Sequence, residues 1–460
     1  MDPVINPDRV VVAGTPRSAD GWLRFFLPRP AKPVVSDDPG ILAKRYRSWR
    51  TRVLISSIIG YATYYFVRKN LSTAMPMMEQ NLGINKTDLG LFLSLHGVIY
   101  GISKFTNGFL GDRADARLFM VVGLVGSAIV NVLFGFSSTV AVLGSLWMLN
   151  GWFQGMGFPP CARLLTHWFP PRELATRMSI WNTSHSIGAG IIVVLCGYLV
   201  VIDWRLCFVV PAALAFLCAI FLWRTLPDTP RSVGLPELDS TQKTLPAAGT
   251  TTDFWPILKR YVFSNPYIWI VSFANFFVYT LRYTILDWGP SLLTQSKHIQ
   301  ITHAAWMVAG FEVSGLIGAL LAGWLTDRFF GGRGARASVF FMICAGISIF
   351  LFWKNPYPSE LVSTALLCLS GFFIYGPQCL VGVIAANLGT NRAAASAVGL
   401  TGLFGYASTL LSGVGLGALV QHRGWDLGFA GLLVVAAIGT VLFIAAWPAP
   451  AHGYDTVRAS

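Results

Sequence analysis

Charged residues are scarce in this chain of 460 residues. Asp, Glu, Lys and Arg together make up 12% of it, about half of their usual share in soluble domains. Acidic residues are the rarer kind, with 21 Asp and Glu against 34 Lys and Arg, so the formal net charge is +13. Because 54% of the residues are hydrophobic and the mean hydropathy is +0.58, the composition excludes a soluble globular protein and indicates a polytopic membrane protein.

Sequence signs of enzyme chemistry are missing as well. The chain has no Gly-rich phosphate-cradling loop, no nucleophile elbow and no cluster of metal ligands. Its seven cysteines lie in or beside apolar stretches without the spacing of a metal site or a disulfide framework. We therefore predict neither an enzyme nor a bound cofactor or metal. The first 50 residues lack the pattern of a signal peptide and are interpreted as a cytoplasmic tail.

Apolar windows of about 20 residues, long enough to cross a bilayer, recur along the chain and predict about twelve transmembrane helices. The expected spans of the first half are 53–77, 88–110, 118–136, 140–164, 175–201 and 204–223. Those of the second half are 267–290, 302–326, 335–353, 359–385, 393–420 and 425–447. The predicted organisation is a tail (1–52), a six-helix bundle (53–224), a polar central loop (225–264), a second bundle (265–449) and a short tail (450–460).

Basic residues gather on alternate loops. Arg113 and Arg117, then Arg172 and Arg177, then Arg328, Arg333 and Arg336 fall on one side of the predicted membrane. Lys and Arg are held on the cytoplasmic side of membrane proteins, so topology rather than nucleic acid explains the positive charge. With an even number of spans and the basic run Lys44, Arg45, Arg47, Arg50 and Arg52 before the first, both termini are expected in the cytoplasm.

The two halves repeat each other. A loop GFLGDRADAR begins at Gly108 and a loop GWLTDRFFGGR begins at Gly323, an offset of 215 residues. Each contains an Asp-Arg pair, Asp112 with Arg113 and Asp327 with Arg328. The Asp can accept hydrogen bonds from helix N-termini and the Arg can pair across the bundle, so these residues are expected to latch the cytoplasmic face. The alternative is a charge cluster that only sets topology.

A polar helix face is repeated at nearly the same offset. Tyr61, Tyr65 and Arg68 lie at i, i+4 and i+7 of the first expected span. Asn275, Tyr279 and Arg282 have the same spacing 214 residues later. An arginine near the bilayer centre costs about 2.5 to 3.5 kcal/mol on insertion scales, so two of them predict a ligand, and planar guanidinium donors suit phosphate. The alternative is that the arginines only pair with Asp287 or Glu312 inside the bundle.

The paired loops, with twelve spans and a central loop, resemble the major facilitator superfamily. A narrower resemblance, to its organophosphate:phosphate antiporter family, extends from about Arg50 to Phe429. It is carried by YYFVRKN, GWFQGMGFPPCARLLTHWF from Gly151, WNTSHSIGAG from Trp181, LRYTILDWGP from Leu281, IYGPQ from Ile374 and GLTGLFGYAS from Gly399. The resemblance implies an all-α membrane fold of two pseudo-symmetric six-helix bundles, with Arg68 and Arg282 holding the phosphate.

Further site residues are implied by the same resemblance. It places Lys104 and His185 near the substrate, and Asp287 and Glu312 near the pathway as countercharges. The cavity tyrosines that it implies are Tyr61, Tyr65, Tyr279, Tyr375 and Tyr406. Two alternatives stay open: His185 could bond a neighbouring backbone or hydroxyl group, and Lys104 could extend to the cytoplasmic surface. Lys69 is a weaker candidate, because it lies about 100° from Arg68 around a continuous helix.

The expected function is exchange of an organophosphate for inorganic phosphate by alternating access, in a monomer in the bacterial inner membrane. Glycerol-3-phosphate is favoured and hexose 6-phosphate comes a close second. One hexose-phosphate branch carries an Asp and a Lys in its eleventh helix, but residues 400–420 have no charge. Two other functions stay open: a transporter-like sensor of sugar phosphates with a membrane kinase as partner, and a proton-coupled carrier of another small solute.

Overall fold

The computed structural model describes residues 30–34, 38–111, 114–236, 258–355 and 359–451. Of the residues singled out above, Asp112 and Arg113 lie outside these ranges. The expected tails 1–52 and 450–460 and the expected central loop are described only in part. Within the described residues the secondary structure is helical throughout, and no strand occurs.

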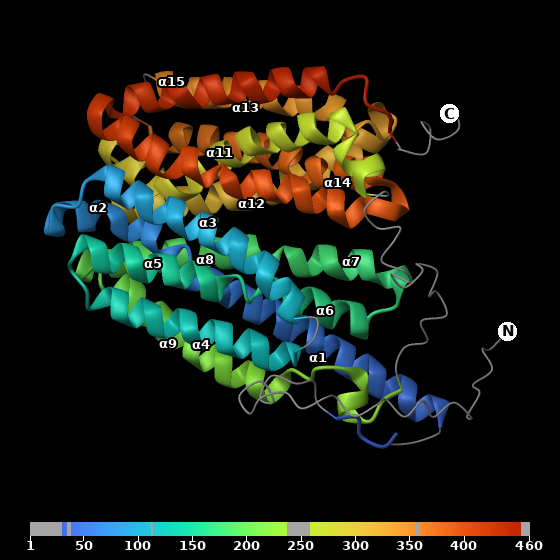
Figure 1. Cartoon of the computed structure of the whole chain (residues 1–460). Helices are drawn as coiled ribbons and strands as arrows, with labels where there is room; N and C mark the ends of the chain where they lie inside the picture. The colour runs from blue at the N-terminus through green and yellow to red at the C-terminus, as the bar shows by residue number, and fades with distance from the viewer. Residues whose placement is uncertain (1–29, 35–37, 112–113, 237–257, 356–358, 452–460) are drawn as a thin grey trace.

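The helices form two groups, which Figure 1 shows one above the other. The first group contains α1 (Pro39–Phe66), α2 (Asn70–Leu82), α3 (Lys86–Gly111), α4 (Ala116–Gly135), α5 (Val140–Gln154), α6 (Phe158–Trp168), α7 (Pro171–Asn182), α8 (Ser184–Ile202) and α9 (Leu206–Thr225). The second contains α11 (Pro266–Lys297), α12 (Ile301–Phe329), α13 (Gly334–Lys354), α14 (Glu360–Ala407), the π-helical turn η4 (Leu411–Gly415) and α15 (Leu416–Ala445). Between them lie the short helices η2 (Pro230–Val233) and η3 (Lys259–Phe263). These groups are the two halves predicted from the repeat.

Nine stretches of the described residues are long and apolar enough to cross a membrane. One of them, Ser396–Ala445, is 50 residues long and contains Gly424, whose φ of 77° interrupts the helix, so it holds the last two expected spans. The first and fourth expected spans are not among the nine, and each is divided between two helices. The breaks fall between α1 and α2, and between α5 and α6. The twelve expected crossings are thereby accounted for.

Two boundaries differ from the prediction. The expected tail 1–52 is helical from Pro39 onward, because α1 extends beyond the apolar stretch, with Asp38 accepting a hydrogen bond from the Gly40 amide at its start. The expected central loop begins with a packed segment rather than a solvated linker. Asp228 is 1% exposed and Leu235 is 1% exposed, so residues 226–236 form part of the first half.

The two halves meet closely near the α2–α3 connection. The Ser94 hydroxyl on α3 donates to the Thr409 carbonyl (2.7 Å) and accepts from the Val414 amide (2.9 Å). A Cβ at Gly90 would lie 2.4 Å from the Gly413 carbonyl oxygen, so this approach of α3 to η4 requires glycine. Gln295 also donates to Glu79 across the halves (2.8 Å).

Hydrogen bonds that join the halves within the described residues run from this connection to the level of Lys104. We call this the closed end. The opposite end carries the loops with Arg117, Arg177, Arg328 and Arg333, and we call it the basic end. A cavity of about 540 Å³ between α3 and α6, lined by Lys104, Phe158 and Arg163, lies toward the basic end.

Candidate anion-binding site between the halves

The first expected span is interrupted at the position of Arg68. Residues 67–69 form a turn between α1 and α2. The Val67 carbonyl is released from the helical pattern and accepts two side-chain amides instead, from Asn131 on α4 (3.1 Å) and Asn150 on α5 (2.8 Å). Non-helical backbone at membrane depth requires such partners, and discontinuous helices commonly mark binding sites in transporters. Two buried asparagine side chains therefore hold this turn.

Arg68 is buried, with 9% of its surface exposed, yet it has no countercharge within the part of the chain that the structure describes. Its guanidinium carbon lies 4.0 Å from the centre of the Tyr100 ring and 5.3 Å from that of Tyr65. Its Nε atom has no hydrogen-bond partner, and within the described residues no carboxylate lies within 4.0 Å of its nitrogens. Aromatic faces stabilise a cation only in part. The arginine is thus arranged to receive an anion.

Arg282 lies within the continuous helix α11 and is 4% exposed. Its Nε donates to the Tyr375 hydroxyl (2.8 Å), and a terminal nitrogen lies 3.6 Å from Glu312. The Tyr375 hydroxyl in turn donates to the same Glu312 oxygen, while the second oxygen of Glu312 is buried without a partner. The alternative that an arginine pairs with Glu312 is therefore realised at Arg282. It is not realised at Arg68.

The two guanidinium groups have side chains near them in common. Tyr65, Tyr283 and His185 each lie within electrostatic range of both Arg68 and Arg282. These side chains come from α1, α11 and α8, so the space between them is enclosed by both halves. The arginines of the two duplicated polar faces thus lie near side chains of both halves.

An ion pair that the sequence did not predict joins the halves beside this space. Lys69 of the first half pairs with Asp287 of α11, and the ammonium lies 5.1 Å from the centre of the Tyr283 ring. Both partners are buried, at 5% and 8% exposure. The low ranking of Lys69 as a site residue assumed a continuous helix. The structure has a turn at residues 67–69 instead, and Lys69 pairs with Asp287.

Lys104 extends from α3 to the opposite half. Its ammonium donates to the Tyr406 hydroxyl of α14 (2.8 Å) and lies 4.0 Å from the centre of the Phe158 ring. The residue is half-buried and lines the cavity toward the basic end. In this conformation Lys104 thus bridges the halves and stands between the central space and that end.

His185 and the tyrosines of the first half form one wall. The His185 ring lies 5.8 Å from the Tyr65 ring, and its Nδ1 contacts the Asn182 carbonyl. Tyr61 packs 5.7 Å from Tyr65 and 4.7 Å from Trp181, measured between ring centres. His185 therefore contacts a neighbouring backbone carbonyl, as the alternative interpretation expected, and also lies beside Tyr65, on the helix face that carries Arg68.

Asn275 lies away from the guanidinium groups. Its amide donates to the Thr401 carbonyl of α14 (2.8 Å), and seven residues separate it from Arg282, about 10 Å along the helix axis. Its Oδ1 atom is buried without a partner. Tyr279, half-buried, packs 5.3 Å from Tyr283. The structure thus places Asn275 in the α11–α14 contact.

Two tyrosines of the site were not predicted. Tyr100 makes the closest ring contact with Arg68, and Tyr283 contacts Lys69. Tyr100 precedes Lys104 by four residues, which puts both on one face of α3. That spacing was the available signal for Tyr100. Tyr283 had no such signal, because it follows Arg282 directly and would lie on another face of α11.

The predicted latch residues Asp327 and Arg328 are exposed at the end of α12 and, within the described residues, form no ion pair. The equivalent end of the first half is held by Asp228, which was not predicted. Its carboxylate accepts from Arg163 (3.0 Å) and from the Ala116 amide (3.0 Å). Burial raises the pKa of Asp228 above its ordinary value, and the Ala116 and Arg163 donors oppose that rise.

Comparison with known proteins decides the family. Residues 57–413 match the family described as the Major Facilitator Superfamily. The chain belongs to the Major Facilitator Superfamily. This membership confirms the predicted all-α fold of two six-helix bundles and the prediction of a transport protein rather than an enzyme.

Several relatives align with this chain over nearly its whole length. A "Probable hexose phosphate transport protein" of Chlamydia trachomatis is 38% identical over 93% of this chain and 97% of its own. The "Glycerol-3-phosphate transporter" of Bacillus subtilis is 38% identical over 91% and 96%. The "Membrane sensor protein UhpC" of Escherichia coli is 35% identical over 91% and 97%. The predicted membership of the organophosphate:phosphate antiporter family is thereby confirmed.

Solved structures support the fold. A bacterial homologue of the human lysosomal transporter Spinster, in an inward-facing unoccupied conformation, superposes with a TM-score of 0.72 at 15% identity. The match covers 87% of this chain and 97% of that one. At this identity the likeness concerns the fold alone.

Proposed function

We propose that this protein exchanges an organophosphate for inorganic phosphate by alternating access, with the phosphate group bound between Arg68 and Arg282. The observation that carries the proposal is a buried arginine from each half, both within electrostatic range of Tyr65, Tyr283 and His185, with Arg68 in no ion pair among the described residues. Guanidinium groups bind phosphate oxygens through paired donors. A phosphate is the ligand that this geometry fits best.

The charge of the site supports a dianion. Four cationic side chains, Arg68, Lys69, Lys104 and Arg282, surround it against the two carboxylates of Asp287 and Glu312. The formal charge is therefore +2. A phosphate monoester carries about −1.5 to −2 at neutral pH, so its binding brings the site close to neutrality.

Binding would also change the contacts of the halves. A phosphate that approaches Arg282 competes with Glu312, whose oxygen lies only 3.6 Å from the guanidinium. By engaging Arg68 at the same time it would draw the halves together on the basic end. Reorientation then requires the Lys69–Asp287 pair at the closed end to separate. The empty site retains its net charge of +2 during this movement, which raises the barrier and makes exchange obligatory.

The substrate proposed first is glycerol-3-phosphate, with hexose 6-phosphate a close second. The glycerol-3-phosphate and hexose phosphate relatives are equally similar to this chain, at 38%. Residues 400–420, without charge, resemble the glycerol-3-phosphate carriers rather than the hexose-phosphate branch that has charges in this helix. Both substrates present the same phosphate to the arginines.

A second candidate function is a membrane sensor of sugar phosphates with a kinase partner. The observation that favours it is the 35% identity to a membrane sensor protein over most of both chains. A sensor needs the same binding arginines but no exchange. A proton-coupled carrier is a further alternative, and it would transport without phosphate on the opposite side.

We further propose a monomer in a bacterial inner membrane with the basic end in the cytoplasm. The end of the described chain supports this orientation, since Ala449 and Ala451 lie beside Gly332 and Arg333 of the α12–α13 loop. The start of α1 lies at the same end, where Arg50 donates to the Trp168 carbonyl at the end of α6 (2.9 Å). Both termini of the helical core thus lie at the basic end, and Figure 1 shows this.

The deciding experiment measures efflux of labelled phosphate from proteoliposomes that contain the purified protein. The external solution contains glycerol-3-phosphate, glucose 6-phosphate, phosphate or no anion. Release that requires an external phosphate compound, and that is lost in Arg282→Lys, establishes exchange and ranks the substrates. Binding of these compounds without any release would identify the sensor. Release driven by a pH gradient alone would identify the proton-coupled carrier.

A further inference from the structure

A second basic site lies away from the central space, at the start of α1. This helix begins at Pro39, well before the apolar part of the span. Its first turns carry five cationic residues in nine positions: Lys44, Arg45, Arg47, Arg50 and Arg52. Charge clusters of this kind beside a transmembrane helix commonly contact anionic lipid. The cytoplasmic location of this segment would by itself explain its positive charge, so a binding site requires further structural evidence.

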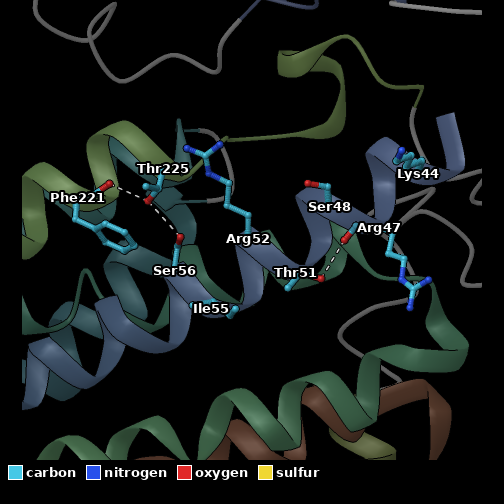
Figure 2. Close-up of a pocket in the computed structure, with 9 residues that line it drawn as sticks. All are labelled: Lys44, Arg47, Ser48, Thr51, Arg52, Ile55, Ser56, Phe221 and Thr225. Atoms are coloured by element: carbon cyan, nitrogen blue, oxygen red, sulfur yellow. Dashed lines mark hydrogen bonds between the residues drawn. The ribbon is translucent and has the colours of Figure 1, made fainter. Parts of the chain in front are cut away.

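The structure forms a cavity of about 600 Å³ between α1 and the end of α9. Lys44, Arg47 and Arg52 line it, together with hydroxyl groups that include Thr51 and Thr225. Figure 2 shows these side chains on successive turns of α1, with Phe221 and Thr225 contributed by α9. The Ser56 hydroxyl donates to Thr225 (3.2 Å), which ties the two helices together at the inner wall. Cations and hydroxyls are the groups that bind phosphate oxygens.

Two cations at the start of α1 have contacts within the protein. Arg50 donates to the Trp168 carbonyl and lies 5.2 Å from the Tyr46 ring centre, and Arg52 lies 4.9 Å from the Trp49 ring centre. Within the described residues, Lys44, Arg47 and Arg52 form no ion pair with a carboxylate. They remain exposed and able to bind an external anion.

Apolar side chains line the part of the cavity next to the cations, further along α1. Ile55 is 51% exposed and Phe221 is 36% exposed, and both line the cavity. Ile59, one turn further along α1, is 42% exposed, as expected for a surface that faces acyl chains. Arg47 and Arg52 are separated by about 7.5 Å along the helix, which matches the thickness of one headgroup layer, roughly 5 to 8 Å. The cavity therefore crosses the boundary between headgroups and hydrocarbon.

We propose that this cavity binds an anionic phospholipid. Its phosphate contacts Arg52, while Arg47 and Lys44 meet the remainder of the headgroup, and an acyl chain lies along Ile55 and Phe221. Charge complementarity selects a headgroup with net negative charge, such as phosphatidylglycerol, over a zwitterionic one. A free phosphate lacks the acyl chain that the apolar side chains would contact. The site is independent of the central arginines and does not rest on the proposed exchange.

The test is native mass spectrometry of the full-length protein with phosphatidylglycerol or phosphatidylcholine added to the detergent. Wild type is expected to retain phosphatidylglycerol preferentially. The double variant Arg47→Gln/Arg52→Gln should bind it about 30-fold more weakly, from about a fivefold loss for each cation near a lipid surface. Arg45→Gln is the matched control, because it removes one charge from the same exposed helix turn without touching the cavity.

A third variant separates shape from charge. Thr51→Trp fills the cavity from an exposed position and leaves the net charge unchanged, so folding should be unaffected and phosphatidylglycerol retention lost. Three results would each overturn the proposal: equal retention of both lipids by wild type, an effect of Arg45→Gln as large per charge as that of the double variant, or full retention by Thr51→Trp. Displacement of the lipid by millimolar inorganic phosphate would show an anion site without lipid specificity and would also overturn it.

Discussion

Substitution of Arg68 by Lys tests the central site without disturbing its surroundings. The side chain has ring contacts with Tyr65 and Tyr100 but, among the described residues, no ion pair that would be lost. Lysine keeps the positive charge and the aromatic contact. It replaces the planar fork of donors by a single ammonium, so it can engage one phosphate oxygen where arginine engages two.

The expected loss follows from that geometry. One charge-assisted hydrogen bond contributes about 1.5 to 3 kcal/mol, so Arg68→Lys should weaken phosphate binding by about 2 kcal/mol, or about 30-fold. The thermal unfolding temperature should stay near the wild-type value, since within the described residues Arg68 forms no ion pair that would be lost and lysine keeps the cationic contact with the tyrosine rings. Arg282→Lys should behave differently, because a single nitrogen replaces the two that Arg282 directs at Tyr375 and Glu312, so binding and stability should both fall.

The assay is equilibrium binding of labelled phosphate to the purified protein, with exchange in proteoliposomes and thermal unfolding measured on the same preparations. Arg45→Lys, the same change at an exposed position of α1, serves as the control. Phosphate binding by Arg68→Lys within threefold of wild type would refute the paired-donor role. A large drop in its unfolding temperature would show instead that Arg68 is structural.

Three further changes test the charges around the arginines. Glu312→Gln removes the carboxylate that competes with phosphate for Arg282. Phosphate should therefore bind about tenfold more tightly, by roughly 1.4 kcal/mol, while exchange becomes slower. An unchanged phosphate affinity would contradict this competition. Asp287→Asn leaves Lys69 buried and unpaired and should destabilise the protein by about 3 kcal/mol. The double variant Lys69→Met/Asp287→Asn should recover much of that stability. If the double variant is as unstable as the single one, the unpaired Lys69 charge is not the cause of the loss. Asp228→Ala leaves Arg163 without its carboxylate and should cost about 3 kcal/mol in thermal unfolding, with phosphate affinity retained; loss of affinity at full stability would assign Asp228 to the site.

Much of the fold and part of the site could be predicted from the sequence. The division into halves followed from the repeat of Arg68 at Arg282, since duplicated polar positions in apolar spans are hard to explain otherwise. The membership in the superfamily confirms that fold. The roles of the individual residues in binding and gating stay predictions.

Other features depend on contacts between distant segments and could not be predicted. The Lys69–Asp287 pair requires the break after α1, and that break depends on Asn131 and Asn150 from two other helices. Helical periodicity describes one helix at a time, so it could not predict that Lys69 pairs with Asp287 of another helix. Asp228 was assigned to a polar loop by composition, although tertiary packing buries it completely.

The clamp on the Val67 carbonyl has a consequence for motion. Two buried hydrogen bonds, donated by the side-chain amides of Asn131 and Asn150, tie the peptide beside Arg68 to α4 and α5. Moving that peptide relative to its bundle would break both, at about 1 to 3 kcal/mol for each buried group left unsatisfied. The backbone at Arg68 is therefore fixed relative to the rest of the first half and should move with it as one rigid body. The C-terminal arginine, held by exchangeable side chains instead, is the adjustable member of the pair, so adaptation to different phosphate esters should fall to the second half.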